Sequence, residues 1–162
     1  MRYFFCDRRK REMEVLPNLY VSTYDTCMDD RVIKQKKIKV IIHVSKRKRF
    51  LDKDKIEEIR VPIEFDENEY DLMQINLDLY NYLYDIVNFI YEKLHENKAV
   101  LLLGFSHKQE VDIIIASYYI RFGKVTPKLA MYYLKTKKKN LFLPECLYEY
   151  CLERFYEDLQ KS

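Results

Sequence analysis

The sequence has no run of about 18 uninterrupted apolar residues, the length that a membrane-spanning helix needs. Near its start, a four-residue apolar stretch is followed at once by charged residues, which is too short for a secretory signal. We therefore expect neither secretion nor membrane insertion. The chain has two glycines and no tryptophan but many Lys, Ile, Asn and Tyr residues, a composition typical of A+T-rich coding genomes such as those of some viruses or parasites.

Disulfide and metal-binding patterns are also missing. The cysteines, which show no C-x-x-C spacing, are Cys6, Cys27, Cys146 and Cys151. A chain of 162 residues with 48% apolar content can bury a core without disulfides. We therefore predict reduced thiols, one compact domain and a cytoplasmic location, in the host cytoplasm if the source is viral. The three histidines lie too far apart for a metal-ligand motif, so neither a metal nor another cofactor is predicted.

Charge does not point to one class of partner. Charged residues make up 34% of the chain and nearly balance, which leaves a net charge of +3. This balance argues for solubility and against general binding to nucleic acid or to a membrane surface. The basic runs at 46–49 and 135–139 are interpreted as solvated loops or helix ends, with contact to nucleic acid or acidic proteins as the alternative.

Hydrophobic periodicity predicts strands that alternate with helices. Apolar and β-branched runs predict strands at 19–21, 39–45, 56–63 and 99–104. Helices are predicted at about 26–36, 71–94 and 109–123, with two more that begin near Thr126 and after Pro144. This order indicates an α/β protein, a single domain with a central mixed, mostly parallel sheet of about four to five strands flanked by helices. We place this domain at 16–162, after an N-terminal segment at 1–15.

One stretch combines a strand, a short polar loop and a helix: "AVLLLGFSHKQEVDIIIASYYI", residues 99–120. In α/β folds such a loop presents backbone N–H groups and the positive end of the helix dipole to an anion. Phosphate-handling enzymes build catalytic loops at this place. An apolar Leu103 at the mouth of the loop is therefore unexpected.

The order and spacing of the motifs resemble those of the cysteine-dependent dual-specificity protein phosphatases, whose signature H-C-x-x-G-x-x-R-S lies between a strand and a helix. The resemblance covers roughly Leu16 to Leu159. Its further parts are "LPNLYVSTYDTC", "KVIIHVS", "IRVPIEFDEN" and "TPKLAMYYLKTKKKNLFLP". It implies the phosphatase fold, with residues 103–110 at the position of the phosphate-binding loop.

The signature residues themselves are missing from this loop. Aligned on Ala116 and Tyr118, the resemblance places the family's histidine on Leu102, its cysteine on Leu103, its glycine on Ser106, its arginine on Gln109 and its serine on Glu110. The rest of the degenerate loop is Gly104, Phe105, His107 and Lys108. Leu103 has no thiolate to attack phosphorus, and the neutral Gln109 cannot replace a bidentate arginine. Glu110 places a carboxylate where it would repel a phosphate dianion.

Other loop residues allow two interpretations each. The resemblance gives Asp66 the family's general-acid position, but we favour a turn residue among neighbouring acids. Ser106 and Gln109 fit an S-x-x-Q capping box, which needs no ligand. His107 and Lys108 could attract an anion, although solvated side chains are the interpretation that we prefer.

The resemblance and the missing residues together predict a catalytically inactive phosphatase-like protein, a pseudophosphatase, that binds a protein partner or itself. One alternative is an enzyme with residual or relocated phosphatase activity on another cysteine, although Cys151 fits a core position better. The other is a phosphoprotein-binding module without turnover, which the Glu110 carboxylate disfavours. The stretch "YYLKTKKKNLFLPECLYEYC" mixes Tyr, Leu and Lys in the manner of contact surfaces.

Overall fold

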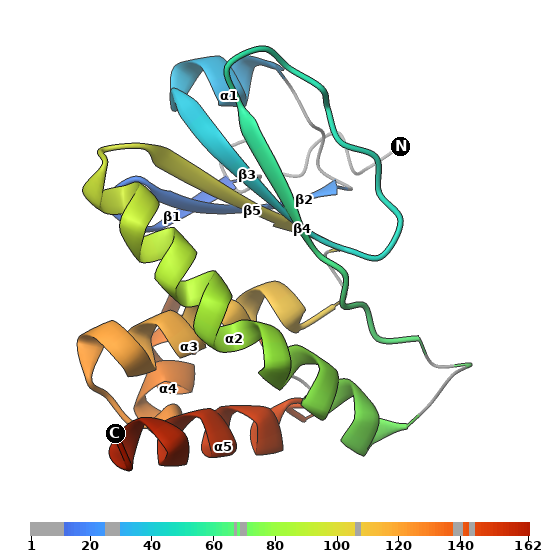
Figure 1. Ribbon diagram of the computed structural model, residues 1–162, viewed down its shortest axis with the longest axis vertical. Coiled ribbons are helices and arrows are strands. Elements are labelled where there is room, and N and C mark those ends of the chain that lie inside the picture. Colours follow the sequence, from blue (N-terminus) through green and yellow to red (C-terminus); the bar gives the residue numbers. More distant parts are fainter. Residues whose placement is uncertain are drawn as a thin grey trace. The chain divides into compact units, whose positions relative to one another are not determined.

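A computed structural model describes residues 12–24, 30–66, 68, 71–105, 108–137, 141–142 and 145–162 of the chain. They divide between two compact units. Unit 1 falls within residues 1–62 and 90–107, and unit 2 within residues 63–89 and 108–162. Figure 1 labels the strands and helices of both units. None of the helices described is long and apolar enough to cross a membrane.

Unit 1 contains a five-stranded sheet with the order β1-β2-β5-β3-β4 (Figure 1). The strands are β1 (Glu12–Leu16), β2 (Leu19–Thr23), β3 (Ile38–Val44), β4 (Glu57–Val61) and β5 (Ala99–Gly104). Among these described strands, β1 and β2 pair in the antiparallel direction, whereas β2–β5, β5–β3 and β3–β4 are parallel. The predicted mixed, mostly parallel sheet is therefore confirmed, with five strands.

Strand β1 was not predicted from the sequence. Its residues Glu12–Leu16 turn back through Pro17 and Asn18 to pair with β2. Asn18 takes the left-handed backbone conformation that a tight turn needs, with φ of 68°, and its N–H donates to Glu14 Oε2. Within the described residues the sheet thus includes residues 12–15, which the sequence analysis placed in the N-terminal segment.

One core cluster of unit 1 lies where β3, β5 and α1 (Asp30–Gln35) meet. The buried members of this cluster are Tyr20, Ile33, Ile38, Ile41, Ala99, Leu101 and Leu103. Strand β5 is buried along its whole length, as expected for a parallel strand in the middle of a sheet. The predicted helix at 26–36 corresponds to α1, with positions 25–29 outside the described residues.

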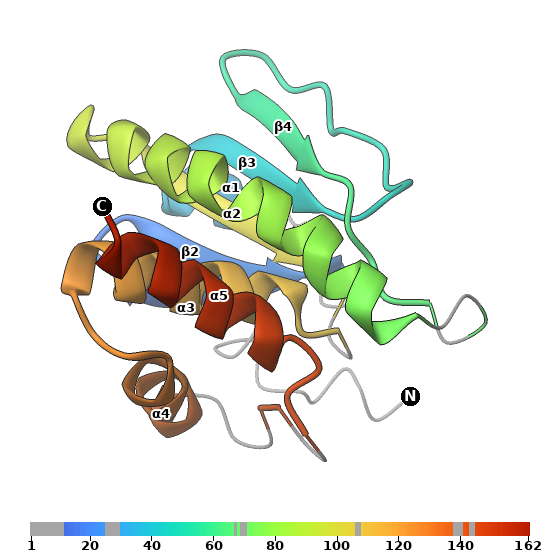
Figure 2. The ribbon, with the colours of Figure 1, turned by 60° about the horizontal axis from the view of Figure 1, so that its bottom comes forward.

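Unit 2 is helical. Its helices are α3 (Glu110–Gly123), α4 (Pro127–Lys137), α5 (Glu149–Gln160) and most of α2 (Leu72–His95), which continues into unit 1 (Figure 2). The predicted apolar stripe of α2 is buried at its centre, at Leu79, Leu83 and Ile86. At the start of the helix Leu72 is instead exposed, so the stripe does not extend over the whole helix.

Buried Asn76 joins α2 to the start of α5 within unit 2. Its amide nitrogen donates to the carbonyl oxygens of Leu72 and Leu147, at 2.8 and 2.9 Å. Its side-chain oxygen accepts from the N–H of Cys151 at 2.9 Å. One side chain thus satisfies polar backbone groups that would otherwise be buried without partners.

Candidate functional site

The final residues of β5 lie in the core of unit 1. Leu103 is opposite Ser22 of β2 and His43 of β3 in the two flanking ladders. Its side chain is fully buried in the core cluster of unit 1. The adjacent Leu102 is also fully buried, and Gly104 ends the strand. An aliphatic side chain at 103 cannot act as a nucleophile, a base or a metal ligand.

A polar network lies next to this strand end in unit 1, and sequence reasoning missed it. The buried His43 contacts the Tyr24 hydroxyl through Nδ1 at 2.7 Å and Glu58 Oε1 through Nε2 at 2.8 Å. Burial lowers the pKa of His43, so the neutral ring fits these contacts with Nε2–H donating to Glu58. The Phe50 and Tyr24 rings stack on His43, and Phe105 packs against Tyr24.

Glu58 also holds the loop that precedes β4. Its two carboxylate oxygens accept the N–H groups of Leu51 and Asp52, both at 2.8 Å. These donors and His43 keep the pKa of Glu58 low despite its burial. The hydrogen-bonding groups of this network thus bind one another and the nearby backbone. Such an arrangement indicates a structural role.

In unit 2, α3 begins at Glu110 with Gln109 as its N-cap residue. The Gln109 side chain makes no capping bond. Its amide nitrogen donates to the carbonyl of Glu145 at 2.9 Å, and its oxygen accepts from the N–H of Leu147 at 2.8 Å. The interpretation of Gln109 as the glutamine of a capping box was therefore wrong. Ser106, the other half of that box, lies outside the described residues.

Glu110 is 2% exposed and points inward. Its Oε1 accepts from the N–H of Phe65 at 2.6 Å, a partner 45 residues away in the sequence. Lys108 donates its Nζ to the carbonyl of the same Phe65 and lies over the Phe65 ring. The Lys108 side chain is therefore engaged with protein groups rather than solvated, contrary to the sequence-based interpretation. His107 lies outside the described residues.

Two buried oxygen atoms in this part of unit 2, Glu110 Oε2 and the Tyr148 hydroxyl, make no hydrogen bond of normal geometry within the described chain. The two side chains nevertheless interact with each other. Burial raises the pKa of Glu110, against the lowering effects of the Phe65 N–H and of Tyr148. Burial and the nearby charge of Glu110 also raise the pKa of Tyr148. The start of α3 therefore carries a carboxyl group that is costly to ionise.

Asp66 is exposed and accepts the N–H of Asn68 at 2.9 Å, which is the geometry of an Asx turn. The described cysteines are free thiols and lie near or in α5. Burial raises the pKa of Cys146 to about 11 and that of Cys151 to about 12, so both stay protonated at neutral pH. Cys6 and Cys27 lie outside the described residues.

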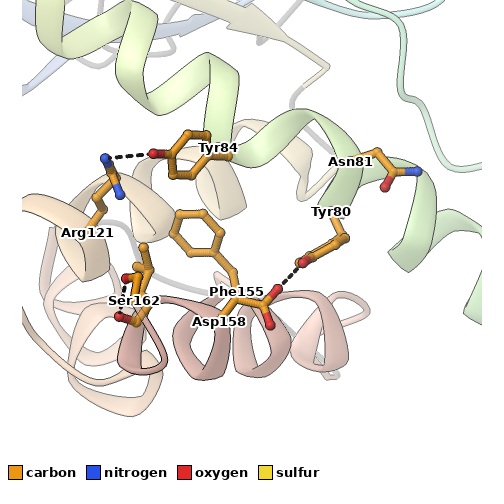
Figure 3. Close-up of a pocket in the computed structure, with 8 residues that line it drawn as sticks. Tyr80, Asn81, Tyr84, Arg121, Phe155, Asp158 and Ser162 are labelled. Carbon is orange, nitrogen blue, oxygen red and sulfur yellow. Dashed lines mark hydrogen bonds between the residues drawn. The ribbon is translucent and has the colours of Figure 1, made fainter.

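A cavity of about 300 Å³ lies within unit 2 (Figure 3). It is lined by Tyr80, Asn81, Tyr84, Arg121, Phe155, Asp158, Leu159 and Ser162. Several of its polar groups are already hydrogen-bonded within the protein. The Tyr80 hydroxyl donates to Asp158, whereas Arg121 donates to Asn88 at 2.9 Å and stacks on the Tyr84 ring. Across the described part of the chain, no group of three or more His, Cys, Asp or Glu side chains is arranged to hold a metal ion.

Comparison with known proteins identifies the fold. No protein-family model and no curated protein matches the sequence. Among solved structures, human DUSP28 aligns with a TM-score of 0.75 and 17% identity over 93% of this chain and 95% of that one. A mouse putative dual specificity phosphatase complexed with zinc tungstate aligns at 0.75 and 16% identity, over 93% and 89%. The human tyrosine phosphatase-like serine/threonine/tyrosine-interacting protein aligns at 0.72 and 16%, over 94% and 100%. The chain therefore has the α/β fold of the dual-specificity phosphatases, as predicted.

Proposed function

We propose that this chain is a catalytically inactive member of the dual-specificity phosphatase fold that acts in the cytoplasm by binding proteins. The observation that carries the proposal is the fully buried Leu103 at the position where the resemblance puts the nucleophilic cysteine. The phosphatase reaction forms a covalent phosphocysteine, and an aliphatic side chain cannot form this bond. The free thiols of Cys146 and Cys151 fit a reducing compartment.

The residues after Leu103 support the same proposal. An arginine in the family's position holds two phosphate oxygens with a bidentate fork. Gln109 carries no charge, and both ends of its amide bind the backbone at Glu145 and Leu147. The Glu110 carboxyl and Lys108 both bind the backbone of Phe65. These side chains stabilise unit 2 from within and are not available to clamp a phosphate.

Relocated catalysis on another cysteine is less well supported. A cysteine nucleophile must be a thiolate, and burial keeps the Cys146 and Cys151 thiols protonated. Aryl phosphate hydrolysis by the full chain decides between the two functions, with an active dual-specificity phosphatase assayed alongside. We expect no turnover above the buffer rate. Hydrolysis that disappears when a single cysteine is replaced would favour the enzyme.

Retention of phosphate affinity without turnover is the third possibility, and tungstate is a suitable probe because the mouse neighbour is described as complexed with zinc tungstate. A calorimetric titration of the full chain with tungstate is expected to show no saturable binding. A matched titration of an active phosphatase verifies the probe. Saturable binding would support a phosphoprotein-binding module instead.

Restoring the nucleophile alone is expected to restore no useful activity. In Leu103→Cys the new thiol would occupy a buried core position, and the chain would still carry Gln109 and Glu110 where the resemblance places the family's arginine and serine. The transition-state charge would therefore stay uncompensated. The measurement is aryl phosphate turnover of the purified variant, with circular dichroism to verify folding. Turnover comparable to that of an active dual-specificity phosphatase would refute this account.

A further inference from the structure

Helix α4 has two apolar stripes, and only one of them is buried. Pro127, Ala130 and Leu134 form the buried stripe. The other stripe consists of Leu129, Tyr132 and Tyr133, which are 39%, 62% and 44% exposed. Their i, i+3, i+4 spacing puts these three side chains on one side of the helix. A helix in a solvated position normally has polar residues there, so this stripe needs an explanation.

The charges of α4 have one sign. Its sequence PKLAMYYLKTK contains three lysines and no acidic residue. Lys128 and Lys135 are exposed, and within the described chain neither has a carboxylate in ion-pair range. Lys135 lies in the last turn, where a cation favours the helix dipole, but Lys128 lies in the first turn, where it opposes the dipole. The position of Lys128 is thus unfavourable for the isolated helix.

The tyrosines of α4 also differ from an exposed tyrosine elsewhere in unit 2. Tyr150 of α5 is 45% exposed and interacts electrostatically with Arg154 of the same helix. Tyr132 and Tyr133 contact each other through their rings, with centroids 6.3 Å apart. Exposed aromatic side chains within a polar rim are typical of protein-binding surfaces, and here the charged residues of α4 are lysines.

We propose that the stripe Leu129–Tyr132–Tyr133 of α4 is the docking surface of this chain, and that its partner is an amphipathic helix whose apolar stripe is flanked by Asp and Glu. The tyrosines and the leucine pack against the apolar stripe of the partner. Lys128 and Lys135 pair with the flanking carboxylates, which also offsets the unfavourable position of Lys128. This assignment rests on the proposed protein-binding function and names the chemistry of the partner.

Two synthetic helical peptides of roughly 20 residues test this proposal, long enough to form a helix. They share one Leu and Ile stripe, which is flanked by Glu in the first peptide and by Lys in the second. By fluorescence anisotropy with the full chain, the Glu peptide is expected to bind about tenfold more tightly than the Lys peptide. Tyr132→Ser should weaken binding of the Glu peptide about tenfold. Tyr150→Ser, the matched control on α5, should leave its Kd unchanged.

Reversing the charge of two lysines of α4 distinguishes docking on this helix from a general attraction between the protein and acidic peptides. The double variant Lys128→Glu with Lys135→Glu is expected to prefer the Lys peptide. Equal affinity for both peptides, no binding of either, or a preference that survives this exchange would overturn the proposal. Binding of anionic vesicles or nucleic acid in place of the Glu peptide would overturn it as well. Failure of the proposed function would appear separately, as turnover in the aryl phosphate assay.

Discussion

Leu103→Ala is expected to lower the free energy of unfolding by about 2–5 kcal/mol, the range for truncation of a buried leucine in a well-packed core. Leu103 is fully buried on a central strand. Its neighbours in the cluster belong to the sheet and to α1. Strands β2 and β3 hydrogen-bond to β5 on both sides and limit how far the site can collapse around the missing methyl groups.

Urea or guanidinium unfolding followed by circular dichroism measures this loss as a shift of the midpoint at constant m-value. Leu129→Ala on α4 is the matched control, because the same atoms are removed from a residue that is 39% exposed. Its expected effect is within about 0.5 kcal/mol. A loss for Leu103→Ala as small as that of the control would show that position 103 does not support the core.

The environment of position 103 suits a residue that stabilises the core and does not suit a catalytic residue. A catalytic thiolate needs an electropositive, partly exposed surrounding, whereas an aliphatic side chain gains stability from complete burial. Leu103 lies in the fully buried environment that suits an aliphatic side chain. We therefore expect Leu103→Cys to lower the free energy of unfolding, but by less than Leu103→Ala does. We expect it to gain no phosphatase activity. The two variants together test whether this residue contributes to packing or to function.

The regular elements of the fold were predictable because their signals are local. The β-branched run of β3 and the three- and four-residue spacing of α2 gave the correct element types and approximate bounds. Strand β1 was missed although its sequence EMEVL alternates polar and apolar residues, because residues 1–15 were assigned to an N-terminal segment outside the domain. The end of α3 at Gly123 was predicted correctly, and the left-handed cap residue that follows it is Lys124.

The candidate site was less predictable, because its contacts join distant parts of the sequence. Sequence reasoning indicated that Gln109 and Glu110 occupy the start of a helix. The partner of Glu110 at Phe65 is 45 residues away, and the loop partners of Gln109 are 36 and 38 residues away. No spacing rule connects such groups. The His43–Glu58 contact was missed for the same reason, since it forms only when β3 and β4 pair.

Glu110→Gln is expected to stabilise the protein at neutral pH by about 1–3 kcal/mol, the range for a buried polar atom whose hydrogen bonding is incomplete. Glutamine keeps a side-chain oxygen that can accept from the N–H of Phe65. It replaces the carboxyl group by a neutral amide whose nitrogen can donate to the Tyr148 hydroxyl, which interacts with the Glu110 carboxyl without a hydrogen bond of normal geometry. The substitution removes the charge that burial opposes.

The pH dependence of this gain has a definite sign. Burial raises the pKa of Glu110 above its ordinary value of 4.5, so the folded chain holds this proton more tightly than the unfolded chain does. As the pH rises above 4.5, Glu110 ionises in the unfolded state before it ionises in the folded state. This lowers the free energy of the unfolded state relative to the folded state, so the contribution of Glu110 to stability falls. Glutamine does not titrate. The advantage of Glu110→Gln should therefore be small near about pH 4 and grow toward about pH 8.

Chemical unfolding of both proteins at several pH values measures this difference. Glu153→Gln, on the exposed side of α5, is the matched control and should change stability by no more than about 0.5 kcal/mol. A variant Glu110→Gln that is less stable than the natural protein at neutral pH would contradict the prediction. That result would mean that the charge of Glu110 is compensated in the folded state, and a carboxylate ionised at the start of α3 would repel a phosphate even more strongly.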